Sequence, residues 1–440
     1  MKRVPFVTLF SVVFALALTL TGCGGGSSTP PLQTTGTSTQ IGFGDAVGDN
    51  VAKLELTVTA ITLTGVAPTA NTGNLLAAPG EIEFVHTAGT IEPFSVGKIP
   101  PGTYSGATLT VSNPEVTVVN AGVVTKPAAT LASPTVTVTF ASNVTVGTTP
   151  FFLNFDLDIT KSLDLTKTPV LVTPTLTVTT STVPADQNGE DHDNGENDDV
   201  HGTVTAIAAP NFTISTKGGA SIVFATDANT KFHDGITQLS DLKVNDIVEV
   251  DAVTKTDGSK LATKVEREGG QNGEEAEGII SAVDNPLTKI TIAHQVDSTN
   301  STTAPATVDI TVNATTVYSV RADKLNVTPP LFDATHIAPG QRIEADADGT
   351  APIVAKKVKL REQALLGTVS NASAAGFTLT PSPTSAFATL SKATSVAVTF
   401  ASGSKQIVAP ANGATIRVRG LVFVSGTTYS MIAVRTDNNN

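Results

Sequence analysis

The chain has 440 residues, 40% of them hydrophobic and 15% charged, and a formal net charge of −12. This length allows roughly three or four domains, and the hydrophobic share is large enough for packed cores, which excludes wholesale disorder. A negative surface repels phosphate backbones, so we expect no nucleic acid among the partners of this chain.

The first segment has the layout of a secretory signal. A basic pair at positions 2 and 3 precedes an apolar run over residues 4–20, which is too short and wrongly flanked for a lasting membrane span. The motif Leu-Thr-Gly-Cys follows at residues 20–23 and holds the only cysteine of the sequence. The motif resembles the lipobox of bacterial lipoproteins. The alternative is an ordinary signal peptide followed by a chance cysteine.

The lipobox resemblance implies a location for the protein. It implies cleavage between Gly22 and Cys23, removal of residues 1–22 as a signal peptide, and attachment of acyl chains to Cys23. Residues 23–40 would then be a lipidated flexible tether, because they are rich in Gly, Ser and Thr and lack apolar periodicity. Gly24 in place of Asp implies, by the same resemblance, sorting to the outer membrane, on its periplasmic or surface face.

Residues 41–183 alternate between apolar and polar side chains, with turn signals between the runs. A period of two predicts β-strands with one buried and one solvated face. The apolar phase flips near Ala60, which indicates a β-bulge. The clearest strand is predicted over residues 151–160, and Pro174 confines the last strand to an edge or a bulge. The segment is therefore predicted to be a β-sandwich.

Three motifs in this segment resemble a family of bacterial lipoprotein domains of unknown function. They lie at residues 44–51, at residues 99–104, and at residues 153–156 ahead of Lys161. The resemblance covers nearly all of residues 41–183 and implies a prealbumin-like, carbohydrate-binding-like sandwich. That family has no established activity, so the resemblance implies a fold and a setting but no catalytic residue.

Residues 184–201 break the β-pattern with acids, amides and glycines, so we predict an acidic, solvated linker there. Three units with the same order of short strands follow, at residues 202–268, 276–362 and 365–436. The units resemble a second family of unknown function, a small barrel related in shape to the OB-fold. The chain is thus predicted to be all-β, with an N-terminal β-sandwich followed by three small OB-like β-barrel repeats.

That second family usually has glycine in the turn before its central strand. Gly340 matches this pattern, and the first unit has Asn245, which also tolerates a left-handed conformation. In the third unit the corresponding residues, 410–414, are shifted, and the sequence leaves their register open.

Outward polar positions differ between the units, whereas the core positions agree. The corresponding pairs are Glu249 and Asp251, Glu344 and Asp346, and Arg417 and Arg419. We interpret this variation as surface chemistry without fixed roles, because a reaction centre needs particular groups at hydrogen-bond distance. The barrels are therefore expected to fold independently and to serve as a spacer and interaction scaffold.

Motifs for enzymatic nucleophiles are absent from the sequence. It contains no Gly-x-Ser-x-Gly elbow, no His-Glu-x-x-His motif and no cysteine besides Cys23. We therefore expect neither enzymatic activity nor a cofactor.

Acidic residues offer the remaining chemistry, since calcium prefers hard oxygen ligands. The weak candidates for metal ligands are Asp45, Asp49, Asp156, Asp158, Asp191 and Asp193. The first four could converge at one end of the sandwich, although turn capping explains them as well. The last two lie in the acidic linker, where the spacing resembles the start of an EF-hand loop. The turn glycine is displaced there, and the alternative is a solvated linker that attracts divalent cations weakly.

Taken together, these patterns predict a membrane-anchored cell-envelope lipoprotein that acts as a non-enzymatic binding or structural module. Its partners would be the membrane, through the lipid on Cys23, and an unknown envelope or extracellular component. A carbohydrate- or calcium-linked adhesion module is the alternative, and an uncharacterised enzyme is the third interpretation.

Overall fold

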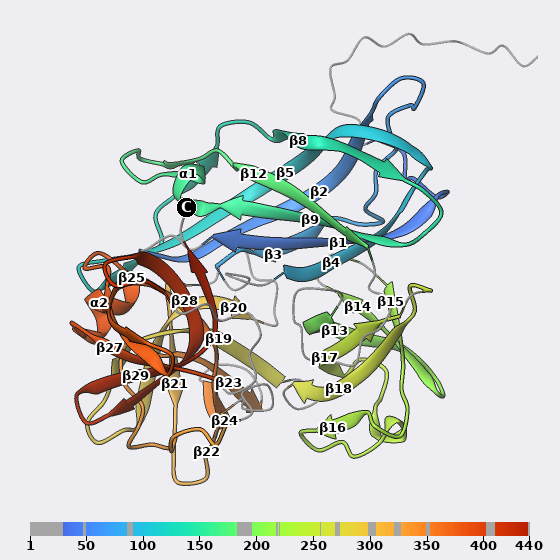
Figure 1. Ribbon diagram of the computed structural model, residues 1–440. Helices are drawn as coiled ribbons and strands as arrows, with labels where there is room; N and C mark the ends of the chain where they lie inside the picture. Colours follow the sequence, from blue (N-terminus) through green and yellow to red (C-terminus); the bar gives the residue numbers. More distant parts are fainter. Residues whose placement is uncertain are drawn as a thin grey trace, which may run out of the picture.

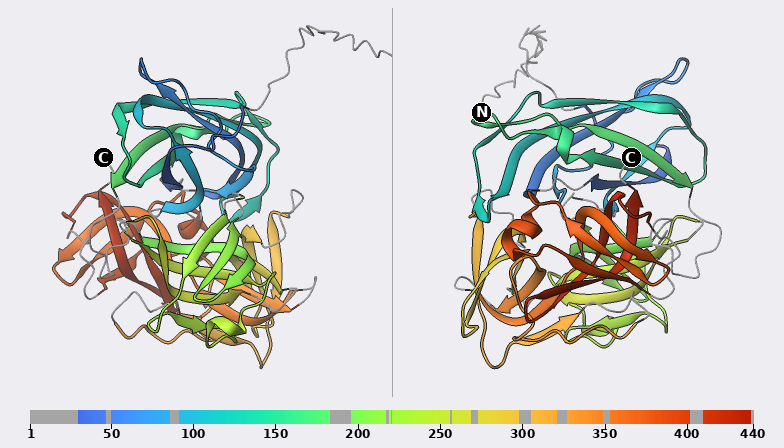
Figure 2. Two further views of the ribbon diagram at one scale, coloured as in Figure 1. Left: turned by 90° about the vertical axis from the view of Figure 1, so that its right-hand side faces the viewer. Right: turned by 60° about the vertical axis from the view of Figure 1, so that its left-hand side comes forward.

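The computed structural model describes residues 30–46, 50–85, 91–182, 196–216, 219, 221–255, 257–268, 273–297, 305–320, 327–348, 353–401 and 410–438. In this part of the chain a β-sandwich sits on three barrels (Figure 1). Two further views keep the sandwich on one side and all three barrels on the other (Figure 2). The predicted all-β class, a sandwich followed by three barrels, is confirmed.

Two main sheets form the sandwich. The first has the order β12 (Leu176–Thr182), β9 (Phe151–Asp158), β1 (Thr37–Ala46) and β4 (Ile91–Ile99). The second has the order β3 (Gly80–Glu83), β2 (Val51–Gly65), β5 (Gly102–Asn120) and β6 (Val123–Thr125), and β8 (Thr135–Val146) also pairs with β5. A small third sheet contains β10 (Leu163–Asp164), β11 (Val170–Val172) and β7 (Ala129–Leu131). Strands β1 and β9 run parallel, so the chain crosses between the layers before it returns to the first sheet.

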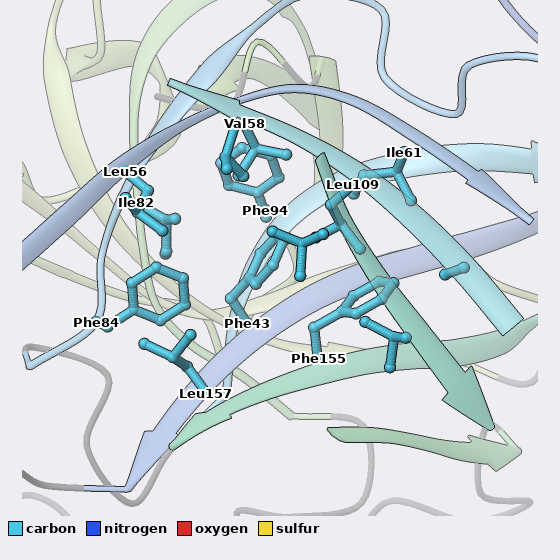
Figure 3. Close-up of a cluster of buried hydrophobic side chains, with 14 of the residues drawn as sticks. Phe43, Leu56, Val58, Ile61, Ile82, Phe84, Phe94, Leu109, Phe155 and Leu157 are labelled. Carbon is cyan, nitrogen blue, oxygen red and sulfur yellow. The ribbon is translucent and has the colours of Figure 1, made fainter. Parts of the chain in front are cut away.

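Phenylalanine rings fill the space between the two main sheets. The Phe43 ring packs edge-on against Phe84 at 5.9 Å and Phe94 at 5.0 Å, and it stacks on Phe155 at 5.4 Å between ring centroids. Leucine, isoleucine and valine side chains from both sheets surround these rings (Figure 3). The alternation of the sequence places them there, because every second side chain of a strand points to the same face.

Several local predictions for the sandwich agree with the structure. The pairing of β2 with β5 shifts register between Val58 and Ala60, as the predicted bulge requires. Pro174 falls in the gap between β11 and β12, so it interrupts no ladder. The strand predicted over residues 151–160 ends earlier, however, because the short helix α1 (Ile159–Ser162) begins there.

The barrels are built from short strands with few helical turns. The first contains β13 (Glu196–Ala208), β14 (Asn211–Thr216), β15 (Ser221–Ala225), β16 (Lys231–His233), the 3-10 turn η1 (Leu239–Asp241), β17 (Ile247–Thr254) and β18 (Lys260–Glu268). The second contains β19 (Gly273–Val283), β20 (Lys289–Asp297), β21 (Thr307–Thr311), β22 (Val317–Val320), β23 (Arg342–Asp348) and β24 (Ile353–Leu360). The third contains β25 (Gln363–Ser373), β26 (Gly376–Pro381), α2 (Ala386–Ser391), β27 (Val396–Phe400), β28 (Thr415–Ser425) and β29 (Thr428–Asn438). No helix in the described part of the chain is long and apolar enough to cross a bilayer.

All three barrels follow one strand path. Each path closes through a parallel pairing, which joins β15 to β18, β21 to β24, and β27 to β29. The remaining pairs of each closed path are antiparallel. Closure removes the unpaired edges that a small open sheet would expose.

A left-handed turn residue fixes the register of the repeats. The backbone N–H groups of Asn245, Gly340 and Gly413 each donate to the first strand of their barrel at 2.8 Å. Their φ angles are 76°, 91° and 82°, in the region that favours glycine and asparagine. Gly413 is therefore the turn residue of the third repeat, whose register the sequence left open.

Strand β13 begins inside the range predicted as linker. It starts at Glu196, whereas the acidic linker was predicted over residues 184–201. Val200 is buried in the core of the first barrel and pairs with Val250. The apolar Val200 lets the strand begin before residue 202, where the change in composition suggested that the barrel starts. Residues 184–195 lie outside the described residues.

The barrels are not separate units. Leu421, Phe423 and Ile432 of the third barrel belong to the same hydrophobic cluster as the core of the second barrel. The Gln341 side chain also donates to the carbonyl of Val422 at 3.0 Å across this boundary. This continuity contradicts the prediction of independently folding barrels for the second and third repeats.

The sandwich is joined to the barrels in two ways. Ala52 and Val119 at one end of the second sheet pack with Ala386 and Leu390 of α2 in a small apolar cluster. The first barrel approaches β4 instead, where the Thr216 hydroxyl donates to the carbonyl of Phe94 at 3.3 Å. Ala293 of β20 belongs to the same apolar cluster, so the sandwich contacts the second and third barrels through apolar side chains and the first barrel through polar groups.

Candidate functional site: a charge cluster between the first two barrels

Most of the residues singled out from the sequence lie outside the described residues. These are Gly22, Cys23, Asp49, Asp191 and Asp193. Only the backbone of Asp45 is described, and it pairs with Leu157 in the parallel ladder of β1 and β9.

Asp158 serves as the N-cap of α1. Its carboxylate accepts a hydrogen bond from the backbone N–H of Lys161 at 3.1 Å and one from the Thr160 hydroxyl at 2.6 Å. Burial raises the pKa of Asp158, but these donors and the Lys161 ammonium outweigh burial and hold the pKa below its usual value. Capping thus accounts for Asp158, and no group of acidic, His or Cys side chains among the described residues is arranged to hold a metal ion.

Ionisable side chains gather instead where the first and second barrels meet. We call this group the interbarrel charge cluster. Its members in the first barrel are Asp234, Glu249, Asp251, Lys264 and Glu266, and those in and after the second are Glu277, Arg342, Glu344, Asp346, Lys357, Lys359 and Arg361. Glu249 is 1% exposed, Glu344 0% and Lys359 4%, so its centre is shielded from water.

Lys359 joins the two barrels at the centre of the cluster. Its ammonium lies 2.7 Å from Glu266 of the first barrel and 2.8 Å from Glu344 of its own barrel. Asp346 is 3.4 Å from the same nitrogen. Lys357, two residues earlier on β24, reaches across to Asp234 at 2.7 Å. Two lysines on one face of one strand therefore contact acids of both barrels.

Arg361 forms a second bridge beside Lys359. Its Nη1 lies 3.2 Å from Glu249 of the first barrel and 3.1 Å from Glu344 of the second. Arg342 pairs with Glu277 at 2.7 Å within the second barrel. Paired charges of this kind are what buried ionisable groups require, since an unpaired charge away from water is costly.

Strand register explains why these residues meet. Glu249 is opposite Glu266 in the first barrel, and Glu344 is opposite Lys359 in the second. Outward positions of neighbouring strands stand in one row, so each barrel presents a face of charged side chains. The faces of the two barrels are placed against each other, and lysine and arginine on the second are complementary to acids on the first.

Comparison with known families adds one match. Residues 201–266 match the family described as Domain of unknown function (DUF5666). The matched segment runs from β13 to β18, so it contains the strand path of the first barrel and its contribution to the charge cluster. No curated protein matches the chain.

Ionisable groups of the DUF5666 domain have shifted pKa values at this interface. Burial raises the pKa of Glu266, but the hydrogen bond with Asp234 and the ammonium groups of Lys359 and Lys264 outweigh it and lower the pKa far below its usual value. Burial and the neighbouring Glu266 carboxyl raise the pKa of Asp234. The two carboxyl groups therefore titrate as a pair, in which Glu266 loses its proton at lower pH than Asp234.

The lysine opposite the DUF5666 domain is shifted in the complementary direction. Burial lowers the pKa of Lys359, but the carboxylates of Glu344, Asp346 and Glu266 outweigh burial and raise the pKa well above its usual value. Both central groups are thus fixed in their charged forms at neutral pH. A general acid or base needs a pKa near the working pH, so this arrangement suits attachment of the barrels and not proton transfer.

A different lysine lies where the DUF5666 domain meets the sandwich. Lys260, at the start of β18, donates hydrogen bonds to the Thr254 hydroxyl at 2.9 Å and to Gln40 Oε1 of β1. Burial lowers the pKa of Lys260 to about 7. A lysine that is partly neutral at neutral pH can act as a base or nucleophile, but this side chain is enclosed between two domains.

The charge cluster was not predicted from the sequence. Glu249, Glu344 and Arg417 were predicted to be variable surface positions, whereas the first two are buried between barrels. Arg419, two residues after Arg417, is buried too and pairs with Glu362 at 3.0 Å. Glu249 and Glu344 have the same sign, so they gave no signal. The signal in the sequence was the change from Glu266 to Lys359, which stand at equivalent outward positions opposite Glu249 and Glu344 and indicate complementary faces once the barrels are known to touch.

Proposed function

We propose that this protein is a cell-envelope lipoprotein that is anchored through lipid on Cys23 and acts as a non-enzymatic binding or structural module. The lipobox-like motif at residues 20–23 supports the anchor, and Gly24 supports the outer membrane as its location. The membrane and an envelope or extracellular component would be its partners.

One observation of the structure carries the non-enzymatic part of the proposal. Glu266 and Lys359, the strongly shifted groups at the centre of the charge cluster, are shifted away from neutral pH and are paired across two domains. Catalytic groups show the opposite tendency, since their pKa values are tuned toward the pH at which they work. Ion pairs between barrels would give the module a fixed shape for presenting a surface.

The anchor is tested by membrane fractionation of the Cys23→Ala variant. Acyl chains drive membrane partition by about 0.8 kcal/mol per buried methylene, so loss of the lipid should move the protein to the soluble fraction. Incorporation of labelled palmitate should be lost as well. Equal recovery of variant and wild type in the membrane pellet would contradict the anchor.

The binding role is tested on isolated envelope material with a soluble fragment of residues 30–440, which keeps all of β1 and the Gln40 side chain that accepts from Lys260. We expect saturable retention of this fragment. Retention should survive the Lys260→Met substitution, because Lys260 is enclosed between the first barrel and the sandwich and presents no surface to a partner. The enzyme interpretation would gain support if Lys260→Met left the fold intact but abolished turnover of an envelope substrate.

A further inference from the structure

The outer face of the second sandwich sheet is covered with threonine. The outward residues are Thr57, Thr59, Thr62 and Thr64 on β2, Thr108 and Thr110 on β5, and Thr135, Thr137 and Thr139 on β8. We call this surface the threonine face. None of its members is buried, and those on β8 are exposed. Strand β8 lies on the side of the sandwich that faces away from the barrels (Figure 1).

Strand register orders these side chains in two directions. Thr62 pairs with Thr108, and Thr108 pairs with Thr137, so one row of three crosses the sheet. Neighbouring strands are about 4.8 Å apart, and alternate residues along a strand are about 6.7 Å apart. In the next row Gly106 stands between Thr64 and Thr139, because a Cβ there would lie 2.6 Å from the carbonyl of Val138.

Most hydroxyls in this array are not used by the protein. Among the described residues, the side chains of Thr62, Thr64, Thr108, Thr110, Thr137 and Thr139 make no hydrogen bond to another protein group. Threonine elsewhere in the chain is used differently: the Thr230 hydroxyl donates to the carbonyl of Ala262 at 2.7 Å, and the Thr316 hydroxyl donates to that of Ala355 at 2.9 Å. The face therefore presents donors and acceptors that are free to pair with a ligand.

The threonine face is also free of charge in a strongly acidic protein. The parts of β2 and β5 that carry it, and all of β8, contain no charged residue. The nearest charges are acidic: Glu81 of β3, which pairs with Thr57, and the opposed pair Glu55 and Glu115. Anionic polymers are repelled by a protein of net charge −12, and nothing on this face offsets that repulsion. An uncharged partner fits the face.

The stiffness of threonine favours binding to an extended, regular partner. Branching at Cβ restricts χ1, so little side-chain entropy is lost when the hydroxyls are fixed against a ligand. Each hydroxyl offers one donor and two acceptor positions, which matches the hydroxyls of sugars. A repeat in two directions suits a polymer with many equivalent groups better than a single compact molecule.

We propose that the threonine face binds a linear, uncharged polysaccharide that lies across β2, β5 and β8. The proposal deepens the binding role given under "Proposed function" and rests on it, because it names the class of partner. The face and the Cys23 anchor are separate features, so an anchored protein would hold such a polymer at the membrane.

The test is sedimentation of the purified full-length chain with insoluble cellulose and chitin, and affinity electrophoresis in gels that contain xylan or laminarin. The test variant is Thr108→Val with Thr137→Val, which keeps the branched shape and removes two hydroxyls. The control is Thr177→Val with Thr179→Val, two exposed threonines on β12 of the other sheet. Two hydrogen bonds correspond to roughly 5- to 150-fold in affinity, so the test variant should be weakened by that factor and the control unchanged.

Several results would overturn the proposal. The proposal is wrong if the wild-type protein is retained on none of these polysaccharides. It is also wrong if wild type and the test variant are retained equally. Retention on anionic alginate alone, lost with salt, would assign binding to charge. Inhibition of ice recrystallisation without polysaccharide binding would assign the face to ordered water. Failure here leaves membrane fractionation and envelope retention unaffected, so it is distinguishable from failure of the proposed function.

Discussion

Replacing Lys359 with methionine should destabilise the protein strongly. Methionine keeps a long unbranched side chain but removes the ammonium that lies 2.7 Å from Glu266, 2.8 Å from Glu344 and 3.4 Å from Asp346. Lys359 is 4% exposed, so water cannot replace the lost charge. Removing one partner of a buried ion pair typically costs about 3–5 kcal/mol of unfolding free energy, and we expect a loss in that range.

Lys289→Met is the matched control for this experiment. Lys289 also forms an ion pair, at 3.0 Å from Asp309, but its side chain is 42% exposed and that of Asp309 is 56% exposed. An exposed pair contributes about 0–1 kcal/mol, so the control should unfold close to wild type. The chain has no tryptophan, and unfolding in guanidinium chloride is therefore followed by far-UV circular dichroism.

The pH dependence gives this prediction a second readout. The pKa of Glu266 is lower in the folded protein than its usual value of 4.5, so its contribution to stability is present above that pH and is lost as the pH falls. The difference between wild type and Lys359→Met should consequently narrow as the pH is lowered through this range. A Lys359→Met variant within about 1 kcal/mol of wild type at pH 7 would show that the cluster is solvated and that our reasoning is wrong.

Two further variants test the other interfaces. The pKa of Lys260 is lowered to about 7, so between about pH 7 and 10 the unfolded chain binds a proton that the folded chain lacks. The unfolding free energy of wild type should therefore rise with pH, by at most roughly 1.4 kcal/mol per pH unit. Lys260→Met should lose this slope in denaturant titrations at pH 7, 8 and 9. Identical slopes would contradict the assignment. Phe423→Ala should lower the unfolding free energy by about 3–5 kcal/mol, because Phe423 is buried in the core that the second and third barrels share. In calorimetry, a fragment of residues 273–362 should unfold without cooperativity, whereas a fragment of residues 273–438 should unfold cooperatively. A sharp transition of the shorter fragment would show that the second barrel does not need its neighbour.

Local features of the fold could be predicted from the sequence. Period-two alternation located the strands of the sandwich, and the flip near Ala60 located a bulge, because both depend on side chains that are close in the chain. Pro174 indicated an edge or a bulge because it lacks a backbone donor, and in the structure β11 ends before it and β12 begins after it. The end of β9 was missed, since Asp158 stops the strand by capping α1, and a capping aspartate looks the same in sequence as an exposed strand residue.

The candidate site depended on contacts that local patterns do not contain. Glu249 and Glu344 occupy outward positions of their strands, and in an isolated barrel such positions face water. They become buried only because the second barrel is placed against the first, and that placement depends on Lys359 and Arg361, far away in the sequence. Periodicity predicts which face of a strand a side chain occupies, but it does not predict which faces meet.

The position of β1 has a mechanical consequence. Tension on the chain ahead of Pro31 would first load the hydrogen bonds that join Pro31 and Gln33 to Asn74. It would then reach β1, which lies inside its sheet between β9 and β4. Hydrogen bonds of both ladders run across the strand, so a pull along it loads them together in shear, whereas an edge strand pulled sideways would peel one bond at a time. A protein held at a membrane by its N-terminal end would therefore carry load in the middle of the sandwich, on the domain that bears the threonine face, and the barrels would lie outside the loaded path.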